Sequence, residues 1–135
     1  MKEIKVPVSP GELLDKITIL RIKAQRMSNP AKVANVRFEL TALQATWAAA
    51  SDPAAAGAAA MGVDAEISAL MAVNERLWVI EDDIRDKERA QTFDAEFIRL
   101  ARAVYIENDE RAAIKRRINV KLGSSIIEEK SYQSY

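Results

Sequence analysis

Hydrophobic residues recur every three or four positions between residues 67 and 88, and this spacing predicts a long amphipathic helix. The apolar stripe consists of Leu70, Val73, Leu77, Ile80 and Ile84. A second line with the same spacing borders the stripe and consists of Asn74, Trp78, Glu81, Arg85 and Glu88. Residues three and four positions apart lie on one face of a helix. An amide, an indole and three charged groups would therefore follow the edge of the core, where a site could be built.

The N-terminal third of the chain carries the start signals of two more helices. Residues 2 to 8 alternate between apolar and polar, which predicts a short extended arm that lies on the helices. Ser9 before Pro10, with Glu12 three residues after the serine, is the pattern of a capping box, and the helix is expected to run to about Met27. Its core stripe is Leu13, Ile17, Leu20, Ala24 and Met27.

The next helix is predicted from about Pro30 to Ala50, because Asn29-Pro30 repeats the cap-then-proline signal. Its stripe is Val33, Val36, Leu40, Leu43 and Trp47. A turn this short makes the two helices an antiparallel hairpin. Residues 50 to 63 are rich in alanine but broken by proline and glycine, so we expect a flexible loop there, followed by Asp64 as the cap of the central helix.

The last helix is expected to begin with Thr92 or Asp94 as its cap and to end at Gly123. The polar run from Glu107 to Glu110 interrupts its stripe, which predicts a kink or a fifth helix starting at Asn108 or Asp109. We expect the tail to pack at least to Ile127. The predicted fold is therefore all-α: one domain over residues 1–135, a bundle of four principal helices, or five, in two antiparallel hairpins with a short extended N-terminal arm.

Composition removes several kinds of chemistry. The 135 residues include no His and no Cys, which excludes Ser-His-Asp and Cys-His catalysis, disulfides and thiolate zinc sites. The formal net charge is zero, so no field of the whole protein attracts nucleic acid or an anionic membrane. The start lacks the apolar core of a signal peptide, and no apolar run approaches the roughly 20 residues of a membrane span. We expect a cytoplasmic protein and, from its long apolar stripes, a homodimer.

A second polar line is predicted on the last helix, where Tyr105, Asn108, Lys115 and Asn119 share a face. If this face meets the polar line of the central helix, the two form a groove suited to a small polar ligand. With two cations of the first helix, the candidate ligand-binding residues are Lys16, Arg21, Asn74, Trp78, Glu81, Arg85, Tyr105, Asn108, Lys115 and Asn119. The alternative is ordinary packing, because polar residues beside a helix core usually reach solvent or pair across helices. Glu81 and Arg85 also form a common i,i+4 pair.

Acidic and basic clusters point to no further partner. Glu12 and Asp15, like Glu107 and Glu110, have the spacing of helical Mg²⁺ ligands, but the capping box already uses Glu12. Acidic runs are more often solvated helix faces, so we expect no metal and no cofactor. The basic residues 115 to 121 suit the negative end of a helix, and we expect no nucleic acid partner.

Four stretches resemble one family. They are residues 9–20 (SPGELLDKITIL), Leu77-Trp78 before Glu81-Asp82, Asn108-Asp109 before Lys115 and Asn119, and residues 128–132 (EEKSY). Together they resemble an uncharacterised bacterial family of small standalone proteins, over nearly the whole chain outside the Ala-rich loop. That family carries no assigned activity. The resemblance implies that the opening motif and the tail belong to a site.

A fainter resemblance links residues 93–98 and 105–108 to the all-helical chorismate mutases. Those enzymes clamp a dicarboxylate with Arg and Lys and place Gln or Glu at the ether oxygen that breaks. Here Leu14 and Ala113 stand at the helix-one arginine and helix-end Gln or Glu positions, so the catalytic set is not reproduced. The resemblance implies a fold analogy, which carries no function by itself.

These observations predict a binding or interaction module with a small anionic ligand or a protein partner. The alternative is an enzyme for a small anionic metabolite, with Glu81 as acid or base and an anion clamp drawn from Lys16, Arg21, Arg85 or Lys115. A buried Glu81 in a pocket shared with Lys16 or Lys115 would favour the enzyme. An exposed Glu81 beside an apolar groove would favour the interaction module. A purely structural subunit would have neither pocket nor groove.

Overall fold

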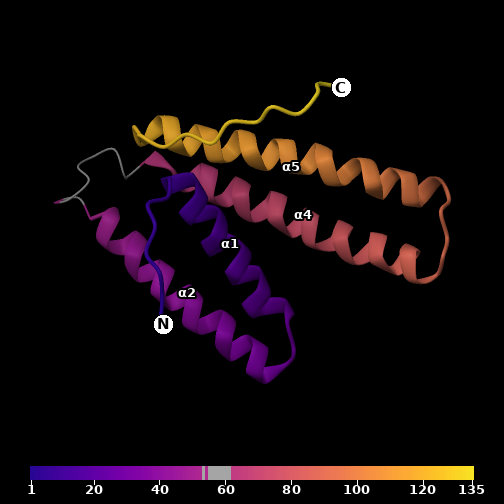
Figure 1. Ribbon diagram of the computed structural model, residues 1–135, viewed down its shortest axis with the longest axis horizontal. Helices are drawn as coiled ribbons and strands as arrows, with labels where there is room; N and C mark the ends of the chain where they lie inside the picture. Colours follow the sequence, from indigo (N-terminus) through magenta and orange to yellow (C-terminus); the bar gives the residue numbers. More distant parts are fainter. Residues whose placement is uncertain (53, 55–61) are drawn as a thin grey trace.

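The computed structural model describes residues 1–52, 54 and 62–135, and in these residues the chain is an all-helical bundle without strands (Figure 1). The helices are α1 (Pro10–Arg26), α2 (Pro30–Ala50), α4 (Asp64–Arg89) and α5 (Ala95–Lys121). α1 packs on α2, and α4 packs on α5, with short turns between the partners. The predicted fold class and its two antiparallel hairpins are confirmed.

Three of the four helix starts follow the predicted capping signals. The Oγ of Ser9 accepts a hydrogen bond from the Glu12 N–H at 3.1 Å, and the Oδ1 of Asn29 accepts from Ala31 at 3.1 Å. At α5 the cap is Asp94, whose Oδ1 accepts from the Phe97 N–H at 3.0 Å. These bonds satisfy backbone donors that the first turn of a helix leaves free.

Other details of the helix ends differ from the prediction. Asp64 is the first residue of α4 rather than its cap; Val63 holds the cap position, without a side-chain capping bond among the described residues. The Glu12 carboxylate bonds Lys115 instead of closing the capping box.

The fifth helix predicted to start at Asn108 or Asp109 is also wrong, because α5 runs without interruption from Ala95 to Lys121 (Figure 1). The polar run 107–110 stays helical because its side chains find partners elsewhere: Glu107 pairs with Arg76 of α4 at 2.9 Å, and Asp109 pairs with Lys130 of the tail at 2.6 Å.

The core lies where α1 crosses α4 and α5. The buried cluster there consists of Leu14, Val63, Leu70, Val73, Ile114 and Ile118, with Trp47 of α2 packed against it. None of residues 30–50, all of which the structure describes, is fully buried. α2 therefore covers α1 from outside, and the site has to be sought among α1, α4 and α5.

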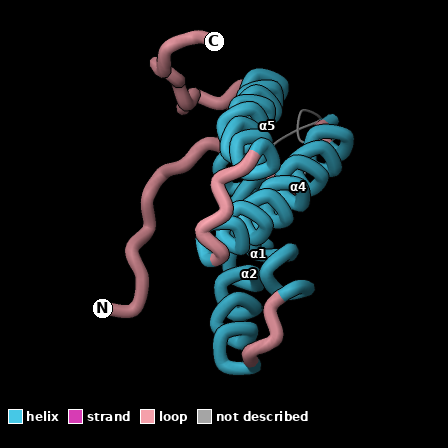
Figure 2. Tube along the Cα trace, turned by 90° about the vertical axis from the view of Figure 1, so that its right-hand side faces the viewer, coloured by secondary structure: helices cyan, strands magenta, loops and turns pink. Residues whose placement is uncertain are grey.

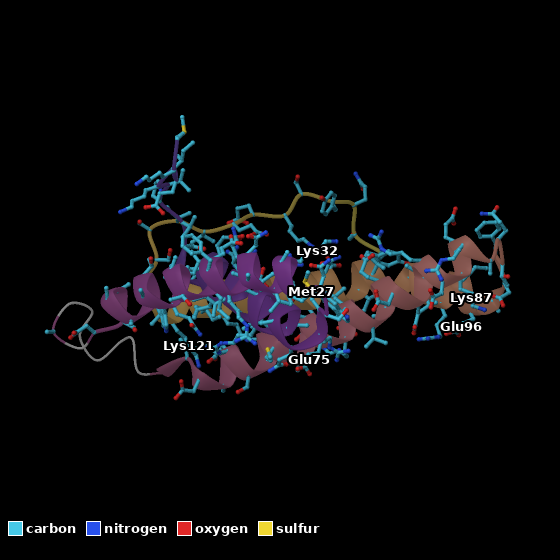
Figure 3. All side chains as sticks on the ribbon, turned by 90° about the horizontal axis from the view of Figure 1, so that it is seen from below. Met27, Lys32, Glu75, Lys87, Glu96 and Lys121 are labelled. Carbon is cyan, nitrogen blue, oxygen red and sulfur yellow. The ribbon has the colours of Figure 1, made fainter. Side chains whose placement is uncertain are left out.

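The α4–α5 hairpin extends beyond α1 to its own turn (Figure 1). In Figure 3 the labelled Lys121 and Lys87 mark its two ends, with Lys87 at the turn, where it pairs with Asp94 at 3.0 Å. Ile80 and Ile84 of the predicted core stripe are only half-buried here, because α1 does not reach this far.

Both chain ends are extended. Residues 1–8 are exposed, and Figure 2 shows the arm leading away from the helices, so the prediction that it lies on the bundle is wrong. The tail, residues 123–135, runs back beside α5 (Figure 1), but Ile126 and Ile127 remain exposed, so it does not pack as predicted. Most of the predicted flexible loop, residues 50–63, lies outside the described residues. In the part of the chain that the structure describes, no helix has both the length and the apolar character to cross a lipid bilayer.

Candidate functional site

A buried carboxylate joins the three core helices. Asp15 of α1 is 1% exposed, and its Oδ1 accepts a hydrogen bond from the Nδ2 of Asn74 on α4 at 2.9 Å. Its Oδ2 accepts from the Nε of Arg111 on α5 at 3.1 Å, with the Arg111 Nη2 at 3.0 Å. Burying a charge costs several kcal/mol unless it is paired and hydrogen-bonded, and here both oxygens are satisfied.

Thr18, one turn after Asp15, completes this network. Its hydroxyl donates to the Asp15 carbonyl oxygen at 2.7 Å and accepts from the Asn74 Nδ2 at 3.0 Å. Both N–H groups of the Asn74 amide are therefore engaged, one on Asp15 and one on Thr18. The Asn74 side chain is held in one orientation, which leaves its oxygen as the atom available to a ligand.

The start of α1 touches the backbone of α5 at Gly11. The Gly11 N–H donates a hydrogen bond to the Oδ1 of Asn119 at 2.8 Å. A Cβ at Gly11 would lie 2.6 Å from the carbonyl oxygen of Lys115, closer than side-chain carbons come to backbone. Glycine is required for this approach. The approach in turn brings Glu12 to Lys115.

A cavity of about 360 Å³ opens beside the network between α1, α4 and α5, and we name it the helical cavity. Its apolar lining is Ile19, Ile22, Leu77 and Trp78, and its polar lining is Asn74, Glu81, Asp82, Asn108 and Arg111. Hydrogen bonds to the buried Asp15 hold the side chains of both Asn74 and Arg111 in place. The cavity thus combines apolar walls with a few positioned polar groups, as ligand sites do.

Lys115 of α5 is the second buried charge. Its side chain is 7% exposed, and its Nζ donates to Oε2 of Glu12 at 2.6 Å and to Oε2 of Glu128 at 2.7 Å. Burial lowers the pKa of this ammonium, but the hydrogen bonds to the two carboxylates outweigh burial and raise the pKa above its usual value. Lys115 is therefore charged at neutral pH and joins α1, α5 and the tail.

The tail and α5 enclose a second cavity of about 400 Å³, which we name the tail cavity. Its lining includes Tyr105, Asn108, Asp109, Arg111, Lys115, Glu128, Lys130 and Tyr132. Asn108 and Arg111 line both cavities. The Lys115 hydrogen bond lowers the pKa of Glu128, and the Lys130 hydrogen bond, followed by that of Tyr135, lowers the pKa of Asp109.

No family model, curated protein or solved structure matches this chain.

The ten candidate residues named from sequence fall into four groups, three of which lie at the cavities or in the core. Asn74, Trp78, Glu81 and Asn108 line the helical cavity. Tyr105 and Lys115, again with Asn108, line the tail cavity. Asn119 is buried and bonds Gly11. The two polar lines thus lie at neighbouring cavities, and Arg111 stands between them.

The remaining three candidates lie apart from both cavities. Lys16 pairs with Glu39 of α2 at 2.6 Å. Arg21 is exposed on α1. Arg85 is exposed and approaches Glu81 at 3.4 Å along the helix. None of these cations lines either cavity.

The residue patterns missed Asp15, Thr18, Arg111 and Glu128 as individual site residues, although the resemblance included the opening motif with Asp15 and the tail motif with Glu128. A signal for the first two existed, because Asp15, Thr18 and Ile22 are spaced by three and four and share a buried face of α1. Asn108, Arg111 and Lys115 have the same spacing on α5. No local signal marks Glu128, whose partner lies 13 residues away.

The carboxylates considered as Mg²⁺ ligands have other partners. Glu12 bonds Lys115 and Asp15 bonds Arg111. Within residues 1–52, 54 and 62–135, no three carboxylates converge where a metal ion could bind.

Proposed function

We propose that this protein is a binding module that takes a small ligand into the helical cavity. The observation that carries the proposal is the Asp15 network, which fixes Asn74 and Arg111 at the cavity beside the indole of Trp78. Well-packed apolar residues would stabilise a core as well as a buried ion pair does, so stability alone gives weak reason for the network. Fixed polar groups at an apolar cavity do have a use in orienting a ligand.

The charges of the lining select the kind of ligand. Glu81 and Asp82 line the cavity with Arg111 as the only cation among the described lining residues, and Arg111 is already paired with Asp15. The Asn74 oxygen adds an acceptor. We infer a small ligand with N–H donors or a positive charge toward Glu81 and Asp82 and an apolar part against Trp78. This proposal departs from the anionic ligand expected from sequence.

Trp78 fluorescence and thermal unfolding test the proposal. In a Trp47→Phe background Trp78 is the only tryptophan, so its emission reports on the cavity. Amines, zwitterions and anions are compared as three probe groups. A ligand at 100 times its Kd adds about 2.7 kcal/mol to the free energy of unfolding, a midpoint shift of several degrees.

The matched variants are Glu81→Gln in the cavity and Glu88→Gln, exposed on the same helix. We expect an amine or zwitterion to shift both the emission and the midpoint. Glu81→Gln should weaken the shift, and Glu88→Gln should leave it unchanged. No shift with any probe, or equal loss in both variants, would refute the proposal.

An enzyme is less well supported by the same geometry. The Glu81 side chain is 46% exposed, and Lys16 lies on the α2 side of α1, paired with Glu39. The arrangement that would favour acid or base catalysis is a buried Glu81 next to Lys16 or Lys115.

We further propose that the protein forms a homodimer. Phe38 of α2 is 80% exposed, and all five residues of the predicted apolar stripe of α2 are only half-buried. Sedimentation of the wild type and Phe38→Glu tests this, since a monomeric wild type refutes it. A cytoplasmic location and membership of the uncharacterised bacterial family remain predictions.

A further inference from the structure

The tail is held by side chains alone. Within the described chain, residues 127–135 make no backbone-to-backbone hydrogen bond, and all of them are exposed. Most of their contacts with α5 are polar: Glu128 with Lys115, Glu129 with Arg116, and Lys130 and Tyr135 with Asp109. One aromatic contact joins Tyr135 to Tyr105, with ring centroids 5.2 Å apart. Ion pairs with exposed partners contribute little to stability. A single tail side chain such as Glu128 can therefore leave α5 without opening the core.

Lys115 differs from the tail in being buried and fixed. Two carboxylates contact its single ammonium group, at 2.6 and 2.7 Å. Glu12 belongs to α1 and is held there by Gly11 packing against α5. Glu128 belongs to the extended tail. One carboxylate is enough to neutralise Lys115, so another anionic oxygen can take the place of Glu128.

We propose that Glu128 occupies the position of a ligand's carboxylate or phosphate group on Lys115, and that the tail cavity is a second site, for a small aromatic anion. Three cations and two carboxylates line this cavity. When Glu128 leaves, Asp109 is the one lining carboxylate that stays. Each of the three cations keeps another carboxylate partner, Asp15, Glu12 or Asp109, so an anion in the place of Glu128 leaves the charge of the site as it is in the structure. The helical cavity has no such position for an anion, so the two sites take different ligands.

The aromatic part of the ligand follows from the remaining lining. Tyr105 of α5 and Tyr132 of the tail both line the cavity. The apolar side chains of Val104 and Ala112 also line it. Aromatic side chains of this kind bind a flat ring by stacking or edge contacts. Arg111 and Asn108 supply donors next to Lys115.

The tail then acts as an intramolecular competitor. Glu128 is tethered to the same chain, so its effective concentration at Lys115 is roughly in the millimolar range. A free anion must compete with it and therefore binds more weakly. Removing the Glu128 charge removes the competitor and leaves Lys115, Arg111 and the tyrosines in place. An anion therefore binds the variant more tightly than the wild type.

The experiment titrates the full chain with phenyl phosphate and with benzoate, which separate the two anionic groups. The variants are Glu128→Gln and Glu129→Gln, an adjacent control whose partner Arg116 does not line the cavity. We expect Glu128→Gln to bind one or both probes about tenfold more tightly than the wild type. Glu129→Gln should match the wild type, and Lys115→Gln should bind neither probe.

Several results would overturn the proposal. They are equal affinities for wild type and Glu128→Gln, the same gain in Glu129→Gln, retained binding in Lys115→Gln, and no binding of either probe by any of the proteins. The first two comparisons need no variant at a buried position, so they hold even if Lys115→Gln fails to fold. Glu81→Gln, which changes the helical cavity, should leave the phenyl phosphate affinity unchanged.

Discussion

The two cavities share Asn108 and Arg111 but are built in opposite ways. In the helical cavity Asn74 and Arg111 are held in place by hydrogen bonds to Asp15, which is buried between three helices. In the tail cavity three of the ten lining residues come from an extended segment held by exposed charges. A buried network is costly to disturb, whereas an exposed pair exchanges readily with water or a ligand. The first site is therefore preorganised, and the second is closed by a removable part of the chain.

Removing Asp15 should have the largest effect on stability, because Asp15 holds the polar groups of the helical cavity. Asp15→Ala leaves the Arg111 guanidinium and an Asn74 N–H without their buried partner. We expect the free energy of unfolding to fall by about 3 to 5 kcal/mol. Urea unfolding measures the loss, and ligand binding in the helical cavity should be lost with it.

Asp86→Ala is the matched control for Asp15. Its carboxylate pairs with Arg89 at 3.0 Å, and both side chains are exposed. We expect a change within about 0.5 kcal/mol. If both aspartate variants lose the same stability, the buried network is not what holds the three helices together.

Gly11→Ala should have an intermediate effect and tests how the two cavities are linked. The new Cβ would meet the Lys115 carbonyl oxygen at 2.6 Å, and a backbone atom cannot turn aside as a side chain can. We expect a loss of about 1 to 3 kcal/mol, as for other overpacked contacts.

The control for Gly11 is Gly62→Ala, where a Cβ meets nothing within 4 Å. If Gly11→Ala is as stable as Gly62→Ala, α1 can move away from α5 at no cost. The contact between Glu12 and Lys115 would then not be fixed, and the comparison between the two carboxylates on Lys115 would fail.

The fold was predictable because its signals are local. Ser9, Asn29 and Asp94 each cap a helix within three residues of their own position. The stripe of α4 fixed which of its residues are buried near α1, including Leu70 and Val73. The fifth helix predicted at Asn108 was wrong because the contacts that decide this point are not local. The polar residues there are satisfied by Arg76 and Lys130, which no pattern within α5 reveals.

The site was less predictable because it depends on how the helices are rotated against one another. Asn74 bonds Asp15 across 59 residues, and Lys115 bonds Glu12 across 103 residues. The sequence identified one partner of each pair as a candidate but not the contact. The tail motif was singled out by resemblance alone, and the physical reason for it, a carboxylate on a buried lysine, required the structure.

Acid should release the tail with the smallest effect on the stability of the whole molecule. A hydrogen bond from Lys115 lowers the pKa of Glu128, and one from Lys130 lowers the pKa of Asp109, below the usual values of these carboxyl groups. A carboxyl group with a lowered pKa contributes its stability above the unfolded value and loses it as the pH falls through the folded value. Docking of the tail is therefore complete above about pH 5 and is lost in stronger acid.

Amide NMR of residues 128–135 across this range measures the release. We expect these signals to become those of a flexible chain while the helical signals of residues 70 to 80 hardly move, because exposed pairs contribute under about 1 kcal/mol. Glu128→Gln removes the carboxylate on Lys115, so residue 128 should be mobile already at neutral pH, and in Glu129→Gln residue 128 should stay on Lys115. If instead the tail and the helices lose structure at one common pH, the tail is part of the cooperative fold and cannot serve as the removable cover of a site.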